Sequence, residues 1–87
     1  MPIKNNCIYK EVGNEYILIP LEGNNVNVSK VFNLNEVGAF IYRKLKEKDD
    51  IDYVAEELTK EYNVLFDVAK EDVNEFILSL KERGLYE

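Results

Sequence analysis

Histidine is absent from this chain of 87 residues, and cysteine occurs only once, at Cys7. Without histidine, the chain lacks the commonest general base and the commonest metal ligand. A nucleophile paired with a histidine base is therefore impossible, and a single thiol permits neither an internal disulfide nor a cysteine-based zinc site. We predict a protein that is not an enzyme and that holds no metal or cofactor. Cys7 is interpreted as a small hydrophobic residue of the core or of a sheet edge, with a reactive thiol as the alternative.

Basic residues and long apolar runs are also scarce. Eleven Lys and Arg stand against seventeen Asp and Glu, which gives a net charge of -6 and a pI near 4.7. An acidic surface repels the phosphate backbone of nucleic acids. No segment approaches the roughly 20 apolar residues that a membrane helix needs, and the N-terminus lacks the apolar run of a signal peptide. These features predict a cytoplasmic protein that binds neither nucleic acid nor membranes.

The first third of the sequence is rich in β-branched and aromatic residues, interrupted by turn signals. Three strands are predicted, over about residues 7–12, 15–21 and 26–32. Gly13-Asn14 is typical of a hairpin turn between the first two strands. Pro20 indicates an edge or a bulge, because proline cannot donate a hydrogen bond to a neighbouring strand. The order and the short turns predict an antiparallel meander.

The remaining two thirds show helical periodicity, and three helices are predicted over about residues 36–46, 51–62 and 68–83. Asn35, Asp50 and Asp67 precede them and are predicted to be N-caps, because their side-chain oxygens can accept backbone N–H groups of the first turn. Gly84 stands where a left-handed C′ residue belongs, and Leu85 is expected to fold back onto the last turn.

The order of three strands followed by three helices predicts one α+β domain over residues 1–87. A three-stranded antiparallel sheet before a three-helix bundle has the parts of a winged-helix domain. A winged-helix DNA-binding regulator is therefore the alternative function, with the third helix as its recognition helix. However, this helix begins with more acidic than basic residues over 68–76, which disfavours contact with phosphates.

Two features have alternative explanations. Gly38 lies in the first turn of a predicted helix, where glycine costs roughly 0.5–1 kcal/mol relative to alanine. Either another backbone approaches this turn closely, or a first turn simply tolerates glycine. The third strand has a free edge that can pair with an extended peptide. Alternatively, its polar residues Asn27, Ser29 and Lys30 only protect that edge against aggregation.

Three stretches of the sequence, taken in order, resemble the PqqD family. FNLNEVGAFIY at residues 32–42 resembles the string that opens the family's first helix, and DIDYVAEEL at 50–58 is similar to its second helix. DVNEFILSLKERGL at 72–85 is similar to the closing pattern Asp-Val-x-x-Phe-Leu-x-x-Leu-x-x-x-Gly-Leu. The departures are Tyr42, where tryptophan is frequent, and residues 46–48, which replace a common Asp-Gly turn.

The resemblance implies a recognition element for RiPP precursors, which are ribosomally made peptides that are modified in natural-product biosynthesis. Such a peptide chaperone binds the leader of the precursor and presents it to a modifying enzyme, often a radical SAM enzyme of the SPASM type. In the family, the leader adds as a further strand to the third strand and packs into a cleft against the third helix. Carried onto this sequence, the peptide-binding residues are Val28, Ser29, Lys30, Val31, Phe32, Asn33, Val73, Phe76, Ile77 and Leu80. Which face of the strand lines the cleft, and whether Phe32 belongs to the core instead, is left open.

Overall fold

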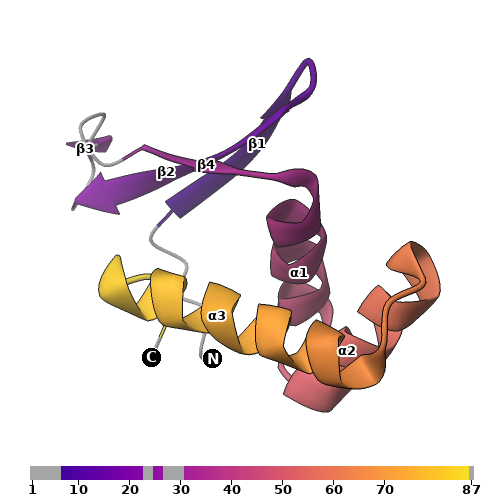
Figure 1. The fold of residues 1–87 in the computed structure, drawn as a ribbon. Coiled ribbons are helices and arrows are strands. Elements are labelled where there is room, and N and C mark those ends of the chain that lie inside the picture. The colour runs from indigo at the N-terminus through magenta and orange to yellow at the C-terminus, as the bar shows by residue number, and fades with distance from the viewer. Residues whose placement is uncertain (1–6, 23–24, 27–30, 87) are drawn as a thin grey trace.

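The computed structural model describes residues 7–22, 25–26 and 31–86 (Figure 1). Its elements follow one another as strands first and helices second. They are β1 (Cys7–Val12), β2 (Glu15–Glu22), β3 (Asn25–Val26), β4 (Phe32–Leu34), α1 (Glu36–Glu47), α2 (Ile51–Tyr62) and α3 (Phe66–Glu82). The predicted α+β order is thereby confirmed. Among the described residues, no helix has the length and apolar character needed to cross a membrane.

β2 is the central strand of an antiparallel sheet. It pairs along its length with β1 on one side, and on the other side it pairs with β4 through Leu18↔Phe32 and Tyr16↔Leu34. Further along, Leu21↔Val26 joins β2 to the short β3. The third predicted strand, 26–32, is therefore represented by β3 and by β4, which continues to Leu34. The predicted strand residues 27–30 lie outside the described part of the chain.

Strand alternation decides which side chains of β4 face the helices. Successive side chains of a strand point to opposite faces. Leu34 is buried and Phe32 packs against the hydrophobic core, whereas Asn33 between them is exposed on the other face. Leu18 of β2, which lies opposite Phe32, is fully buried. Phe32 and Leu34 therefore lie on the inner face, and Asn33 on the outer face.

Two of the three predicted N-caps are confirmed. The Asn35 Oδ1 accepts a hydrogen bond from the Gly38 N–H at 2.7 Å, and the Asp50 Oδ1 accepts one from the Tyr53 N–H at 3.2 Å. The prediction that Asp67 caps the third helix is wrong. That helix begins at Phe66, and its N-cap is Leu65, which offers no capping side chain.

The end of α3 has the predicted geometry. Gly84 has φ +72°, a left-handed conformation that glycine adopts without penalty. The Gly84 N–H donates to the Lys81 carbonyl at 3.0 Å, and the Leu85 N–H donates to the Leu80 carbonyl at 2.8 Å. These two bonds satisfy carbonyls that the helix end leaves free. Leu85 is thereby folded back and buried against the core.

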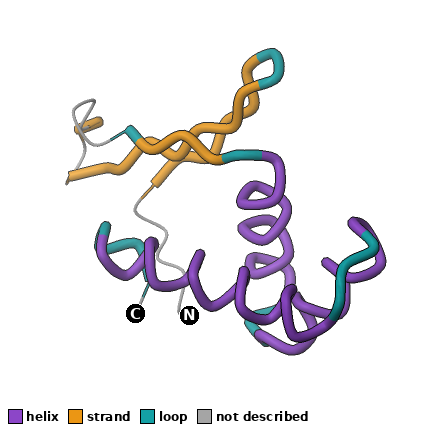
Figure 2. The backbone as a smooth tube through the Cα atoms, viewed as in Figure 1, coloured by secondary structure: helices purple, strands orange, loops and turns teal. Residues whose placement is uncertain are grey.

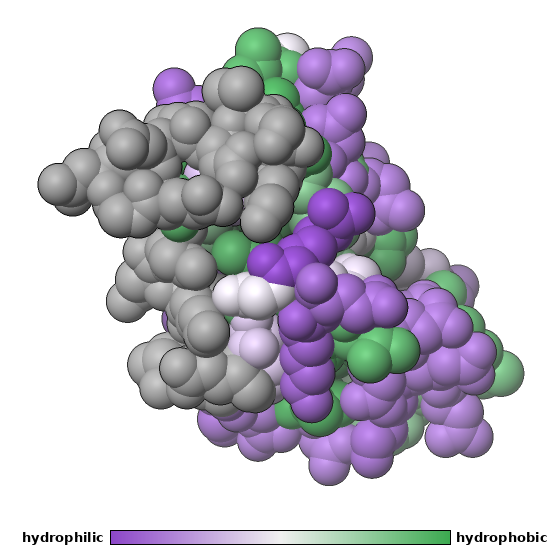
Figure 3. Space-filling view, turned by 90° about the vertical axis from the view of Figure 1, so that its left-hand side faces the viewer, coloured by the Kyte–Doolittle hydropathy of each residue, from purple (hydrophilic) through white to green (hydrophobic). Residues whose placement is uncertain are grey.

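The core lies mainly among the three helices, and Leu18 and Leu34 add the inner face of the sheet to it. Figure 2 shows the strands above α3, with α1 leading from one to the other. The largest fully buried side chains are Leu18, Ile41, Leu45, Leu58, Leu80, Leu85, Val54 and Val73. On the face in Figure 3, hydrophilic residues surround smaller hydrophobic areas, as expected for a chain in which 32% of the residues are charged.

Cys7 lies half-buried where β1 approaches α1. Its Sγ is 3.6 Å from the hydroxyl oxygen of Tyr42, and the Tyr42 ring stacks on that of Tyr9 at 5.2 Å. Burial, followed by the contact with Cys7, raises the pKa of Tyr42 above its usual value. These contacts attach the first strand to the first helix.

The difference between Asp50, which caps a helix, and Asp67, which does not, can be measured by its effect on stability. We expect Asp50→Ala to lower the free energy of unfolding by about 0.5–2 kcal/mol, because it removes a capping hydrogen bond. Asp67 lies inside the first turn of α3, where its charge interacts with the helix dipole, which salt screens, and it has no hydrogen bond or ion pair among the described residues. Asp67→Ala should therefore be nearly neutral in urea unfolding at high ionic strength. Equal losses for the two variants would show that Asp67 acts as a cap.

Candidate functional site

A groove runs where β4, the first turns of α1 and the middle of α3 meet. Its first part, the strand section, has a volume of about 150 Å³ and is lined by Phe32, Asn33, Leu34, Asn35, Gly38 and Phe76. Its second part, the helix section, has a volume of about 400 Å³ and is lined by Asn35, Val37, Gly38, Ile41, Asp72, Glu75 and Phe76. Asn35, Gly38 and Phe76 line both sections, so the two form one continuous groove.

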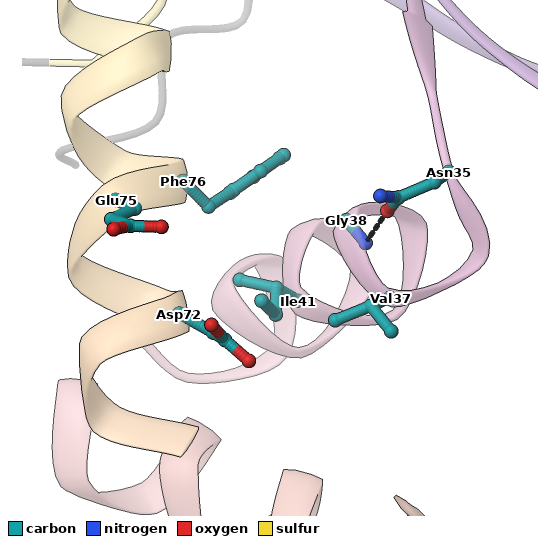
Figure 4. Close-up of a pocket in the computed structure, with 7 residues that line it drawn as sticks. All are labelled: Asn35, Val37, Gly38, Ile41, Asp72, Glu75 and Phe76. Atoms are coloured by element: carbon teal, nitrogen blue, oxygen red, sulfur yellow. Dashed lines mark hydrogen bonds between the residues drawn. The ribbon is translucent and has the colours of Figure 1, made fainter. Parts of the chain in front are cut away.

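Phe76 lies at the junction of the two sections, and its side chain extends from α3 toward α1 (Figure 4). The ring packs so closely on Gly38 that a Cβ there would lie 3.3 Å from Phe76 Cε1 and 3.2 Å from Asn35 Oδ1. The close approach expected at Gly38 is therefore real, but a phenyl ring and a capping amide make it rather than another backbone. Glycine at this position lets α3 approach the start of α1.

One edge of β4 is open along the strand section. β4 pairs with β2 on its other edge, and no strand in the described ranges pairs with the open one. Such an edge presents backbone N–H and C=O groups to which an extended chain can add. Val31, directly before β4, is 39% exposed and adds an apolar side chain at this edge.

Arg83 covers Phe32 at the far end of the strand section from the helix section. The guanidinium carbon lies 3.7 Å from the centre of the Phe32 ring, which is a cation–π contact. The contact links the C-terminal end of α3 to β4. The groove is thus bounded by a basic residue at its strand end and by two acidic residues, Asp72 and Glu75, at its helix end.

The structure distributes the peptide-binding residues expected from the sequence over three environments. Phe32, Asn33 and Phe76 line the groove. The remaining three on α3 are buried in the core behind Phe76: Val73, Ile77 and Leu80. Val31 is exposed beside β4, and three residues lie outside the described part of the chain: Val28, Ser29 and Lys30.

The sequence analysis missed most of the helix section. It assigns no binding role to Val37 or Ile41, and it counts Asp72 and Glu75 only among the acidic residues over 68–76. The available signal was the spacing of residues 72, 75 and 76, which places three side chains on one face of a helix. That spacing indicates a shared face, but not that the face meets the start of α1.

A second cleft, of about 400 Å³, lies between the α1–α2 connection and α3. Its polar groups have partners within the protein. Lys70 and Asp52 form an ion pair at 3.0 Å, and the Tyr86 hydroxyl donates to Asp49 at 3.1 Å. Burial, and then the bond to Asp49, raises the pKa of Tyr86. Across the described ranges, no group of three or more His, Cys, Asp or Glu is arranged to hold a metal ion.

Two solved structures share this fold. One is described as TbiB1 in complex with the TbiA(beta) leader peptide; it is 23% identical, has a TM-score of 0.81, and the match covers 100% of this chain and 95% of that one. The other is described as lasso peptide synthetase B1 complexed with the leader peptide. It is 24% identical and has a TM-score of 0.80, and the match covers 98% of this chain and 94% of that one. No curated protein matches the sequence.

The sequence also matches a family model. That model is the one for PqqD, described as coenzyme PQQ synthesis protein D, and it aligns with residues 15–85. The matched range includes β2, all three helices and every residue that lines the groove. The protein therefore belongs to the PqqD family.

Proposed function

We propose that this protein binds the leader segment of a ribosomally synthesised precursor peptide and presents it to a modifying enzyme. The observation that carries the proposal is the open edge of β4 beside a groove whose wall is the Phe76 ring. Two proteins of the same fold are described as complexes with leader peptides, which supports the same use of this fold here.

The leader adds as a strand to the open edge and places an apolar side chain in the groove. Its binding residues are those expected from the sequence: Val28, Ser29, Lys30, Val31, Phe32, Asn33 and Phe76, with Val73, Ile77 and Leu80 supporting Phe76 from the core. Because backbone pairing is nearly independent of side-chain identity, the groove must supply the sequence preference.

The expected free-energy contributions to binding favour a reversible complex. A few main-chain hydrogen bonds contribute about 0.5–1.5 kcal/mol each, and one or two buried apolar side chains add about 1.5–3 kcal/mol apiece. Ordering a flexible peptide costs about 2–5 kcal/mol. The balance corresponds to micromolar or sub-micromolar affinity, which suits a carrier that must release its peptide.

In this proposal, a partner enzyme carries out the chemical modification of the precursor peptide. The protein contributes no catalytic group and no cofactor, and the modifying enzyme is of the radical SAM type with a SPASM domain, as the family resemblance implies. We place the encounter in the cytoplasm, where ribosomes release the precursor. A direct role on DNA is disfavoured, because α3 carries more carboxylates than lysines and the net charge is -6.

The decisive experiment is an NMR titration with the leader segment of a short precursor peptide encoded beside this gene. We expect saturable amide shifts concentrated at residues 31–35, Gly38 and the α3 residues around Phe76. The absence of such shifts with the cognate precursor in excess would overturn the proposal for that pair. Strong, salt-sensitive binding to duplex DNA would favour the regulator instead.

Gly38→Ala separates binding from folding. The added Cβ meets the Phe76 ring at 3.3 Å and narrows the groove, while alanine is the better helix former by about 0.5–1 kcal/mol. We expect the leader dissociation constant to rise about tenfold, a change of about 1.4 kcal/mol, while the gain in helix propensity partly offsets the cost of displacing the Phe76 ring and the Asn35 cap. Leu78→Ala, at an exposed position of α3 that does not line the groove, is the matched control and should bind normally. Unchanged affinity in Gly38→Ala would exclude the groove as the binding site.

A further inference from the structure

The helix section of the groove extends beyond the end of β4, where no strand edge remains to bind a peptide backbone. Two helices form its walls, with Val37, Gly38 and Ile41 on α1 facing Asp72, Glu75 and Phe76 on α3. Because Asn35, Gly38 and Phe76 also line the strand section, a peptide that leaves the β4 edge past Leu34 enters this second section directly.

The helix section has an apolar floor and an acidic rim. Ile41 is almost fully buried and Val37 packs against the core, so the floor is hydrocarbon. Figure 4 shows the Asp72 side chain leaving α3 toward α1, on the same side as Phe76, and the Glu75 side chain lying in front of α3. Asp72 is half-buried and Glu75 is exposed, which places the two carboxylates at the mouth of the cleft.

Neither carboxylate has a cationic partner in the described part of the chain. Among the described residues, Asp72 and Glu75 form no ion pair and no hydrogen bond through their side chains, and no basic residue lines this section. Some helical acids do have such partners. Glu57, for example, lies 3.6 Å from Lys44 and 3.3 Å from Lys60. Others at exposed positions, such as Glu71 and Glu82, have none among the described residues.

We propose that the helix section is a specificity subsite for a lysine or arginine of the bound peptide. The aliphatic stem lies on Val37, Ile41 and Phe76, and the cation is held between Asp72 and Glu75. Long basic side chains suit such a site because they bury their methylenes and keep the charged group at the rim. This inference rests on the proposed peptide binding and names the residue type that the subsite selects.

Charge decides between the possible occupants. An apolar side chain would fill the floor but would partly desolvate two carboxylates without compensation. An acidic side chain would be repelled by the two carboxylates. A short polar side chain would leave the apolar floor exposed to water. The positive end of the α1 dipole opposes a cation, but the Gly38 N–H at that end is already bonded to Asn35. A basic side chain therefore fits best, because its methylenes cover the apolar floor and its cation pairs with the carboxylates of the rim.

The test uses a display library of random-sequence linear peptides, selected in parallel on wild-type protein and two variants. The first variant, Asp72→Asn with Glu75→Gln, neutralises the rim. The second, Glu71→Gln with Glu82→Gln, makes the same charge change at exposed positions of α3 that do not line the groove. Circular dichroism and thermal melting confirm that all three proteins are folded.

We expect wild type and the Glu71/Glu82 variant to enrich Lys or Arg at a fixed spacing from an apolar residue, and the rim variant to lose this enrichment. A selected peptide should bind the rim variant about tenfold more weakly, as expected for charge-assisted contacts. Its Lys→Gln counterpart should bind wild type and rim variant alike. Equal enrichment in all three proteins, or apolar enrichment without Lys or Arg, overturns the subsite but not peptide binding. If no peptide is enriched on wild type, the proposed function itself is wrong.

Discussion

The contact between Asn35, Gly38 and Phe76 is the constraint on which the arrangement of the groove depends. The Asn35 side chain accepts a hydrogen bond from the Gly38 N–H at 2.7 Å, and Asn35 is the single residue between the end of β4 and the start of α1. The Phe76 ring then packs on the glycine, where a side chain would meet it at 3.3 Å. One capping bond and one missing Cβ thus bring a strand, the start of one helix and the middle of another together.

A second contact holds the far end of the same elements. Arg83, the C-cap of α3, lies 3.7 Å from the Phe32 ring at the start of β4. With Phe76 near the middle of α3 and Arg83 at its end, the helix is attached to β4 and α1 at two points. The left-handed turn at Gly84 then returns Leu85 to the core, so the end of α3 cannot fray without exposing a buried leucine.

How far the sequence predicts the structure depends on the range of each interaction. The caps at Asn35 and Asp50 and the turn at Gly84 were predictable, because each is decided within a few neighbouring residues. The prediction that Asp67 is an N-cap was wrong because it, too, considered only a few neighbouring residues. Asp67 is a good capping residue by type, but the first bond of α3 runs from the Ala69 N–H to the Leu65 carbonyl, which starts the helix earlier.

The candidate site shows the same division. Phe76, Phe32 and Asn33 were expected through the family resemblance, and strand parity assigns Phe32 to the inner face once its pairing with Leu18 is known. The helix section was not predictable, because Val37 and Ile41 meet Asp72 and Glu75 only through the crossing of α1 and α3. No local sequence pattern predicts where two helices cross when another helix lies between them in the sequence.

Features that are locally unfavourable gather at the groove. A glycine occupies a helical turn, a strand edge is open, and two carboxylates lack a cation among the described residues. In the described part of the chain, the groove included, no buried side-chain nitrogen or oxygen lacks a hydrogen-bond partner. Each unfavourable feature by itself has a structural explanation, but an incoming strand with an apolar and a basic side chain would satisfy all of them at once. Sequences are expected to depart from local rules where function requires it, and here the departures lie along one continuous path beside α3.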